Sequence, residues 1–272
     1  MTTPIIVFGA AGRMGLAILR CAAEEPAFFR IAGGVEHPDS PAVGRPIGEL
    51  LGKAELATPV VHSPDRLPAE AASGAVVVDF TSAQATVGHL AWSVQQASGV
   101  VIGTTALNAA QRSKVEAASR KIPVVFAPNM SVGVNVLFKI VGDVARILGE
   151  GYDVEIAEIH HRFKKDAPSG TARRLGEIVA GVMGAPYEDL AVDGRAGITG
   201  ERPTRQIGMH ALRGGDVVGE HTVTFAGLGE RIELTHRAHS RDTFARGALR
   251  AVTWVAGRKP GLYSMQDVLG IK

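Results

Sequence analysis

The residues best suited to chemistry form one cluster halfway along the chain, at 160–171 (HHRFKKDAPSGT). A histidine exchanges its proton near neutral pH, so His160 is a candidate general acid. Lys164 would supply positive charge to an anionic ligand, and such a charge-assisted contact contributes about 1.5–3 kcal/mol. Ser169 is a natural N-cap for the helix expected to follow, whose first N–H groups would receive a carboxylate. The cluster therefore indicates a site that binds a small acid and protonates it.

The same cluster also admits other interpretations. A solvated basic loop followed by an ordinary helix cap is the plain alternative. If the strand expected at 152–160 persisted, His160 and His161 would point to opposite faces. The sequence also has no H-E-x-x-H and no second cysteine, so we expect no metal site. The basic run 162–165 is short, and we expect no nucleic-acid partner. The remaining histidines are expected to have structural or exposed roles: His37, His62, His89, His210, His221, His236 and His239.

A glycine-rich turn near the N-terminus is the second informative feature. Gly9, Gly12 and Gly15 have the spacing G-x-x-G-x-x-G, directly after the apolar run 4–8. Glycine permits a tight turn and a close approach of the backbone to phosphate, and the helix that follows points its free N–H groups at the negative charge. A strand before the turn and a helix after it favour a dinucleotide site over an ordinary glycine turn, which is the alternative.

An acidic residue at the end of the second expected strand supports the dinucleotide interpretation. Glu36 lies 21 residues beyond Gly15, where an acid would hydrogen-bond the ribose hydroxyls. A carboxylate there repels the additional phosphate of NADPH, so Glu36 favours NADH; the alternative is a surface glutamate. Arg13 could still meet that phosphate, which leaves NADPH as the less favoured cofactor.

Two further turns are expected at the same edge of the sheet. Gly103, Thr104 and Thr105 follow one apolar run, and residues 127–130 (APNM) follow the next. In an open α/β sheet, ligands bind beyond the carboxyl ends of the strands. These residues could therefore line the ribose and nicotinamide part of a cleft, although simple turn and cap chemistry explains them equally well.

The first half of the chain alternates short apolar runs with helix-period segments. Strands that are apolar on both faces and separated by helices predict a doubly wound α/β fold with a parallel sheet covered on both sides. The Pro- and Gly-rich segment 36–57 is expected to be a long surface loop. The expected strands are 5–8, 31–35, 60–62, 75–80, 100–103 and 124–127, and the expected helices are 14–24, 84–96 after Thr81 or Ser82, and 109–121 after Asn108.

The pattern changes after Asn129. A long helix is expected to reach about residue 148, followed by a strand at 152–160 and a helix at 170–183. Three long runs at 206–213, 216–225 and 231–239 are separated by Gly214-Gly215 and by Gly227-Leu228-Gly229, which predicts hairpins in a mixed or antiparallel sheet. A last amphipathic helix is expected at 242–256 and could dock back onto the first domain.

Composition describes an ordinary globular protein, with 46% hydrophobic and 21% charged residues. The net charge of +2 does not suggest a polyanion as partner. The single cysteine, Cys21, is expected to be a small core residue in a reduced, cytoplasmic setting. Apolar runs of about 18 residues or more are absent from the sequence, so we expect neither a membrane span nor a signal peptide.

The chain closely resembles the 4-hydroxy-tetrahydrodipicolinate reductase (dihydrodipicolinate reductase) family, and the match extends in order over nearly its whole length. His-His-Arg-x-Lys followed by Asp-Ala-Pro-Ser-Gly-Thr is its most specific part. The matching stretches are 9–15, 78–81, 101–105, 129–135, 158–162, Lys164, 166–171, 213–216, 219–221 and 243–245. Departures from the family pattern are His37, where some members have arginine, Met130, where phenylalanine is frequent, and Phe163, where histidine occurs.

The resemblance implies a fold, a domain division and roles for individual residues. Residues 1–130 and 241–272 would form a Rossmann-type doubly wound parallel sheet that binds the dinucleotide. Residues 131–240 would form an α+β domain with a mixed sheet that binds substrate and builds a homotetramer. His160 and Lys164 match the acid–base pair, and His161, Ser169, Gly170 and Thr171 match positions that bind the substrate's carboxylates. The matching cofactor contacts are Gly9, Ala10, Ala11, Gly12, Arg13, Met14, Glu36, Gly103, Thr104, Thr105, Ala127, Pro128, Asn129 and Met130.

The implied activity is reduction of a cyclic imine dicarboxylate, formed from 4-hydroxy-tetrahydrodipicolinate by loss of water, to tetrahydrodipicolinate. Hydride would reach ring carbon C4, and His160 would supply or relay a proton, with NADH favoured over NADPH. This step belongs to lysine and diaminopimelate biosynthesis. Two alternatives are another dehydrogenase acting on an amino acid or aldehyde, and a nucleotide sensor without catalytic activity.

Overall fold

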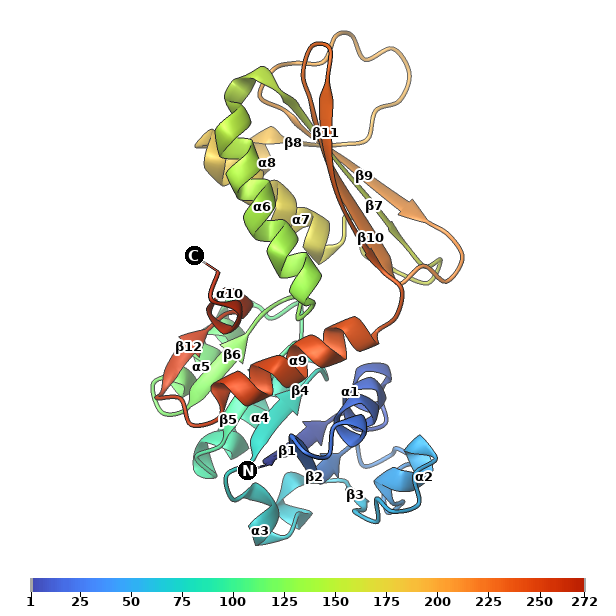
Figure 1. The fold of residues 1–272 in the computed structure, drawn as a ribbon, viewed down its shortest axis with the longest axis vertical. Coiled ribbons are helices and arrows are strands. Elements are labelled where there is room, and N and C mark those ends of the chain that lie inside the picture. Colours follow the sequence, from blue (N-terminus) through green and yellow to red (C-terminus); the bar gives the residue numbers. More distant parts are fainter. Residues whose placement is uncertain (1, 272) are drawn as a thin grey trace. The chain divides into compact units, whose positions relative to one another are not determined.

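The computed structural model describes residues 2–271. The chain divides into two compact units, Met1–Val132 with Arg241–Lys272, and Gly133–Ser240. Each unit has its own sheet and its own hydrophobic packing, and Figure 1 shows the elements of both. The glycine-rich turn therefore belongs to the first unit, and the cluster at 160–171 belongs to the second.

The first unit contains, within residues 2–271, a seven-stranded sheet whose neighbouring strands all pair in parallel. Successive strands are added on one side of β1 as far as β3 and on the other side from β4 to β12, which confirms the predicted Rossmann-type doubly wound fold. In sheet order the strands are β12 (Gly261–Tyr263), β6 (Pro123–Phe126), β5 (Gly99–Ile102), β4 (Val76–Asp79), β1 (Thr3–Phe8), β2 (Phe29–Val35) and β3 (Val60–Val61).

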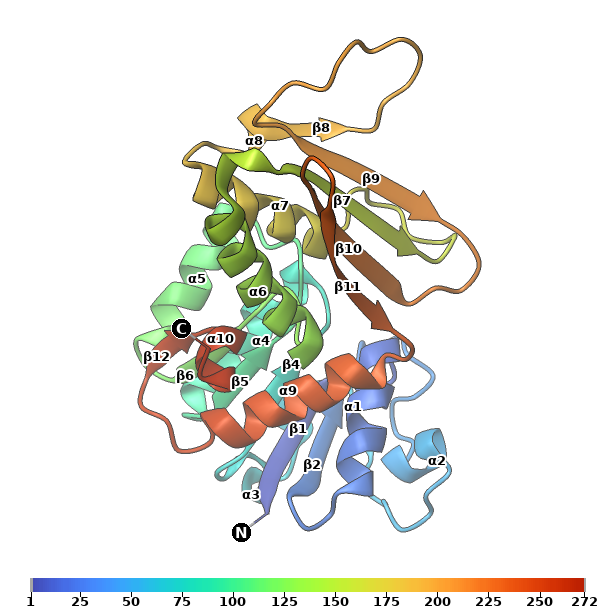
Figure 2. The same cartoon turned by 45° about the horizontal axis from the view of Figure 1, so that its top comes forward.

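Helices cover both faces of this sheet because its strands are apolar on both faces. Along β1, Ile5 and Val7 pack into one hydrophobic cluster, while Ile6 and Phe8 pack into the other. The first cluster is completed by α1 (Arg13–Glu24), α9 (Asp242–Val255) and α10 (Met265–Leu269), and the second by α3 (Ala69–Ala72), α4 (Ala83–Gln95) and α5 (Ala109–Ser119). Figure 2 shows α1 and α9 side by side over the sheet.

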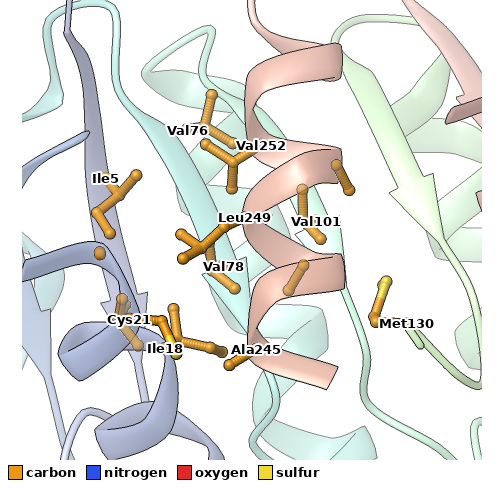
Figure 3. Packing of buried hydrophobic residues seen from close by; sticks show 14 of the residues in the cluster. Ile5, Ile18, Cys21, Val76, Val78, Val101, Met130, Ala245, Leu249 and Val252 are labelled. Atoms are coloured by element: carbon orange, nitrogen blue, oxygen red, sulfur yellow. The ribbon is translucent and has the colours of Figure 1, made fainter. Parts of the chain in front are cut away.

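The C-terminal helix α9 is part of the core of the first unit. Leu249 and Val252 of α9 lie among the inward side chains of β1, β4 and β5, and Cys21 of α1 is buried in the same cluster (Figure 3). The predicted amphipathic helix at 242–256 and the predicted core position of Cys21 are therefore confirmed.

Two parts of the first unit differ from the sequence-based expectation. The segment 36–57 is not only a surface loop, because it contains the short helix α2 (Ile47–Leu51) with Ile47 fully buried. A single buried isoleucine anchors this helix, and one apolar residue does not make a periodic pattern from which a helix could be predicted. The edge strand β12 and helix α10 were also not expected, because three to five residues carry no recognisable period.

Helix caps follow the local sequence more closely. Ser82 caps α4 through the Ala85 N–H, and Asn108 forms a capping box with Gln111 at the start of α5. The structure thus selects Ser82 from the two predicted candidates, Thr81 and Ser82, and confirms the cap at Asn108, because capping depends on residues within one turn of each other.

The second unit contains, among the described residues, a five-stranded mixed sheet in the order β11-β10-β7-β9-β8. Helices α6 (Val132–Leu148) and α7 (Gly170–Met183) pack against the alternate residues of its central strands. The strands are β7 (Asp153–His160), β8 (Ala191–Asp193), β9 (Ile207–Arg213), β10 (Gly219–Ala226) and β11 (Arg231–Ala238), and short helical turns lie at Gly149–Gly151 and α8 (Tyr187–Leu190). Another short helical turn, Pro64–Arg66, belongs to the first unit.

One predicted hairpin is confirmed and the other is wrong. The strands β10 and β11 pair in antiparallel fashion across the turn at 227–230. The strands β9 and β10 do not pair, because β7 lies between them and runs parallel to β9. The Gly214 N–H instead bonds to the His160 carbonyl at 3.0 Å, so the segment after β9 crosses the end of β7.

Among residues 2–271, no helix combines the length and hydrophobicity that crossing a bilayer requires.

Candidate active site

A buried ionic cluster occupies the carboxyl end of β7. Glu158 and His160 continue the inward alternation of Val154 and Ile156. The Glu158 carboxylate, 2% exposed, lies 2.6 Å from His160 Nδ1 and accepts two hydrogen bonds from the Arg213 guanidinium at 2.8 and 2.9 Å. Burial opposes ionisation of Glu158, but the bonds to His160 and Arg213 outweigh it and lower its pKa to about 2. Glu158 is therefore an anion at neutral pH.

The start of α7 is joined to this cluster by its cap. Ser169 Oγ accepts the Ala172 N–H at 3.2 Å, which confirms the predicted N-cap. The Ser169 N–H donates to Glu158 at 3.0 Å, and Ser169 Oγ lies 2.9 Å from His221 Nε2. Ser169 itself is buried, whereas Gly170, the first residue of α7, is exposed with open space around it. The structure thus places the exposed start of a helix beside His160.

The loop before α7 carries Lys164. Its Nζ bonds both carboxylate oxygens of Asp166 at 2.9 Å, and the Asp166 carbonyl accepts a bond from Arg213 at 2.7 Å. Burial raises the pKa of Asp166, but the Lys164 ammonium outweighs this effect and lowers it below its usual value. The His161 N–H at the start of the loop donates to the Val217 carbonyl at 2.7 Å. Through Arg213, the loop that carries Lys164 is tied to the carboxylate that holds His160.

His221, for which the sequence predicts a structural or exposed role, is buried beside this cluster. On β10 it alternates with the core residues Val223 and Phe225 and lies directly opposite Glu158 in the sheet. Its ring contacts that of His160 edge-on, with centroids 5.2 Å apart. Burial, assisted by the nearby His160, lowers the pKa of His221 to about 3. His221 therefore stays neutral in the folded protein at neutral pH.

This neutral histidine predicts a measurable loss of stability in mild acid. His221 has a pKa near 3 when folded and about 6.5 when unfolded, so the unfolded chain binds a proton first as the pH falls below 6.5. The free energy of unfolding should then drop by up to about 1.4 kcal/mol per pH unit from this group alone. When measured by urea unfolding between about pH 6.5 and 5, the free energy of unfolding of His221→Gln should decline less with falling pH than that of the wild type. This window lies above the range where carboxylates titrate. The exposed control His239→Gln should keep the wild-type slope, and equal slopes in all three proteins would contradict the prediction.

In the first unit the glycine-rich turn lies between β1 and α1, as its spacing predicted. Gly9 has a φ of +73°, and its N–H bonds to the Val35 carbonyl at 2.8 Å. A Cβ on Gly15 would lie 2.0 Å from the Gly9 carbonyl oxygen, so α1 packs directly on the turn. Gly12 is the N-cap of α1 and offers no side chain to its first amides. This exposed helix start can receive a phosphate.

Glu36 lies beside that turn. One of its carboxylate oxygens accepts the Ala11 N–H at 2.9 Å, and the other accepts the N–H of His37 at 2.9 Å. The Glu36 carboxylate at the end of β2 is therefore held against the glycine-rich turn, for which the sequence predicts dinucleotide binding.

A second buried carboxylate organises the neighbouring strand ends. Asp79, 1% exposed at the end of β4, accepts bonds from both the N–H and the hydroxyl of Thr81 and lies 2.8 Å from His89 Nδ1. Burial opposes its ionisation, but His89 and Thr81 outweigh burial and lower the pKa of Asp79. Thr104 also bonds to Asp79, at 3.3 Å. This network joins the ends of β4 and β5.

The two further turns lie at the same edge of the sheet, with mixed exposure. A Cβ on Gly103 would lie 2.1 Å from the Phe80 ring, so a larger residue there would require the ring to move. The side chains of Thr104 and Met130 are buried, and Figure 3 shows Met130 among core residues, so a ligand could reach these two residues through their backbone. Thr105 is exposed. In the last turn Ala127 is buried, Pro128 is exposed and the Asn129 side chain accepts the Ser131 N–H at 2.9 Å.

The sequence pattern indicates His160, Lys164 and Ser169 but not the groups that hold them. Strand alternation could have placed Glu158 on the face of His160, two residues away. No local signal could have indicated Arg213, because its position depends on the parallel pairing of β9 with β7.

The comparisons with known proteins agree over the whole chain. Residues 3–130 match the family model described as "Dihydrodipicolinate reductase, N-terminus", and residues 133–269 match "Dihydrodipicolinate reductase, C-terminus". A 4-hydroxy-tetrahydrodipicolinate reductase of Anaeromyxobacter dehalogenans strain 2CP-1 is 52% identical over 270 residues, covering 99% of this chain and 98% of the relative. One of Syntrophus aciditrophicus is 48% identical, covering 98% of each chain.

A solved structure has a similar fold. The dipicolinate-bound dihydrodipicolinate reductase of Paenisporosarcina sp. TG-14 aligns with a TM-score of 0.75 at 23% identity, over 98% of this chain and 99% of the other. Because both halves match in sequence and the relatives match from end to end, the chain belongs to the dihydrodipicolinate reductase family of oxidoreductases.

Proposed function

We propose that this protein reduces the cyclic imine dicarboxylate derived from 4-hydroxy-tetrahydrodipicolinate to tetrahydrodipicolinate, a step of lysine and diaminopimelate biosynthesis. Membership of the family and relatives of that name at about half identity support the reaction. One observation supports the assignment of the site above all. Glu158 contacts His160 and the start of α7, and Arg213 joins Glu158 to the loop that carries Lys164.

We assign the substrate's two carboxylates to the start of α7 and to the loop that carries Lys164. The start of α7, with exposed Gly170 and half-buried Thr171, would receive one carboxylate through backbone N–H groups. Lys164 would exchange its bond with Asp166 for a bond to substrate, and His161 begins the same loop. Ser169 contributes mainly by holding the start of the helix, since its Oγ and N–H are already bonded to the protein.

We assign the nicotinamide nucleotide to the first unit, whose turn fits a pyrophosphate. The turn has no side chain at Gly9 or Gly12 to obstruct a phosphate, and Ala10, Ala11, Arg13 and Met14 complete it. When bound, the nucleotide supplies the hydride. The exposed and backbone groups at 103–105 and 127–130 would orient its nicotinamide end.

NADH is the proposed preference. Glu36 holds a carboxylate against the turn, where it would accept ribose hydroxyls and repel a 2′-phosphate. Arg13 is the group that would allow NADPH to bind.

Gly15→Ala tests the nucleotide site. The new Cβ would lie 2.0 Å from the Gly9 carbonyl oxygen, so α1 must move away from the turn. We expect a loss of about 1–3 kcal/mol in the free energy of unfolding and NADH binding weakened at least about tenfold, measured by fluorescence titration. The control is Gly88→Ala in the exposed part of α4, where a Cβ meets nothing within 4 Å. That change should leave NADH binding unaltered and raise stability by about 0.5–1 kcal/mol. Unchanged NADH affinity in Gly15→Ala would place the nucleotide elsewhere.

Oxidation of NADH and NADPH, followed by absorbance with freshly generated 4-hydroxy-tetrahydrodipicolinate, tests the reaction itself. Turnover with this substrate and none with amino acids or aldehydes is the expected result. Turnover only with an amino acid or aldehyde would support a different dehydrogenase, and nucleotide binding without turnover would support a sensor.

We also propose a homotetramer built through the sheet of the second unit. Among the described residues of that unit, α6 and α7 pack on one face of the sheet, and the other face carries polar pairs such as Thr222 with Thr235 and leaves Leu212 half exposed. Light scattering should report four chains, and a monomeric mass would refute the proposal. The single buried Cys21 supports a reducing, cytoplasmic setting.

A further inference from the structure

The hydrogen bonds around Glu158 constrain where His160 can carry its proton. One oxygen of the carboxylate lies 2.6 Å from His160 Nδ1 and accepts from Arg213 at 2.8 Å; the other accepts from Arg213 at 2.9 Å and from the Ser169 N–H at 3.0 Å. An ionised carboxylate only accepts hydrogen bonds. The contact with His160 therefore requires a proton on Nδ1.

A neutral imidazole has one N–H, so a proton held on Nδ1 leaves the lone pair on Nε2. We propose that Glu158 is a positioning residue that holds neutral His160 in the Nδ1–H form, so that Nε2 is the nitrogen that takes up a proton from water and, from the resulting imidazolium, gives that proton to the substrate. The inference rests on the proposed catalytic role of His160 and adds the atom at which the proton moves and the group that selects it.

The surroundings of Nε2 agree with this assignment. A Cβ on Gly219 would lie 2.8 Å from His160 Nε2, so Gly219 packs closely against this nitrogen and any side chain at that position would obstruct it. His221, whose ring packs edge-on against His160, directs its own Nε2 to Ser169 rather than to His160. Glu158 from β7, Arg213 from β9 and His221 from β10 are thus titratable or charged groups that lie around His160.

Arg213 extends the effect of Glu158 to the second proposed catalytic side chain. Its guanidinium neutralises the carboxylate and also donates to the carbonyl of Asp166, whose side chain holds Lys164. The orientation of His160 and the position of the Lys164 loop therefore depend on the same buried pair.

The opposite face of β7 offers a matched control. Glu155 also lies 2.6 Å from a histidine nitrogen, on His210, and accepts bonds from Arg195 and Arg202. Like Glu158, it has a pKa lowered to about 2, because these partners outweigh its burial. It differs in lying on the face of the sheet away from His160. Glu155→Gln therefore removes an equivalent network without touching the proposed site.

The experiment is ¹⁵N NMR of the full-length protein labelled with ¹⁵N-histidine and without ligands, which shows which ring nitrogen of each histidine carries the proton. Spectra are recorded at a pH where the imidazoles are neutral. The His160 signals are identified by their loss in His160→Gln. The wild type should show His160 protonated at Nδ1. In Glu158→Gln the amide can either donate or accept, so both forms should appear. The kcat of Glu158→Gln should fall at least about tenfold, a factor that corresponds to the free energy of one pKa unit. Its Kd for NADH should stay unchanged. Glu155→Gln should match the wild type in both measurements.

Wild-type His160 protonated at Nε2 would overturn the inference, and this needs no variant to fold. A single Nδ1–H form with full kcat in Glu158→Gln would also overturn it. The proposed function fails differently: full turnover in His160→Gln would remove His160 from the chemistry while leaving the Nδ1–H assignment intact.

Discussion

Replacing His160 with glutamine should lower kcat by about 10²- to 10⁴-fold, the usual contribution of a general acid. Glutamine keeps a polar side chain beside Glu158 but cannot donate a proton in the transition state. Binding of NADH, assigned to the other unit, should not change. Steady-state kinetics with 4-hydroxy-tetrahydrodipicolinate and fluorescence titration with NADH measure the two quantities separately.

His210→Gln is the matched control for this experiment. His210 lies on the same sheet and contacts Glu155 at 2.6 Å, the same distance that separates His160 from Glu158. It should therefore reproduce the structural effect of losing a histidine–carboxylate contact while kcat stays near the wild-type value. If the two variants lost kcat equally, or if kcat and NADH affinity fell together in His160→Gln, His160 would have a structural role only.

Lys164→Ala should lower kcat/KM by about 10- to 100-fold. The physical reason is loss of a charge-assisted bond to a substrate carboxylate, about 1.5–3 kcal/mol, at about 1.4 kcal/mol per factor of ten. The Lys164 side chain is only 19% exposed and is already directed by Asp166, so little additional ordering is needed to bind an anion. The effect should appear in KM for the dicarboxylate as well as in kcat.

Lys165→Ala is the control, because it removes the same charge from the next residue of the loop, where the side chain is exposed. Its screened surface charge should change kcat/KM by less than about threefold. If the two lysine variants behaved alike, the contribution of Lys164 would be general electrostatic attraction rather than a direct contact.

Local sequence accounts for the parts of the site that depend on neighbouring residues. Gly9, Gly12 and Gly15 predicted a strand–turn–helix unit, and the structure contains it, because the close packing of α1 on the turn involves only residues within that unit. Ser169 predicted the cap of α7 for the same reason. The strand predicted at 152–160 likewise ends at His160 in the structure.

Long-range pairing decided the rest. Gly214-Gly215 has the composition of a hairpin turn, yet β9 pairs in parallel with β7, and that pairing brings Arg213 to Glu158. His221 reaches Ser169 because β10 pairs with the other edge of β7. Neither contact has a signal in local sequence, since the partners are separated by more than 50 positions.

The sequence alone therefore determined the family, the glycine-rich turn, the helix caps and the identity of the proposed acid. The tertiary structure decided which nitrogen of that acid faces a buried carboxylate, and which distant arginine neutralises that carboxylate. The physical reason is that propensity and capping act over a single turn or strand, whereas the order of strands in a sheet is selected by burial of whole faces.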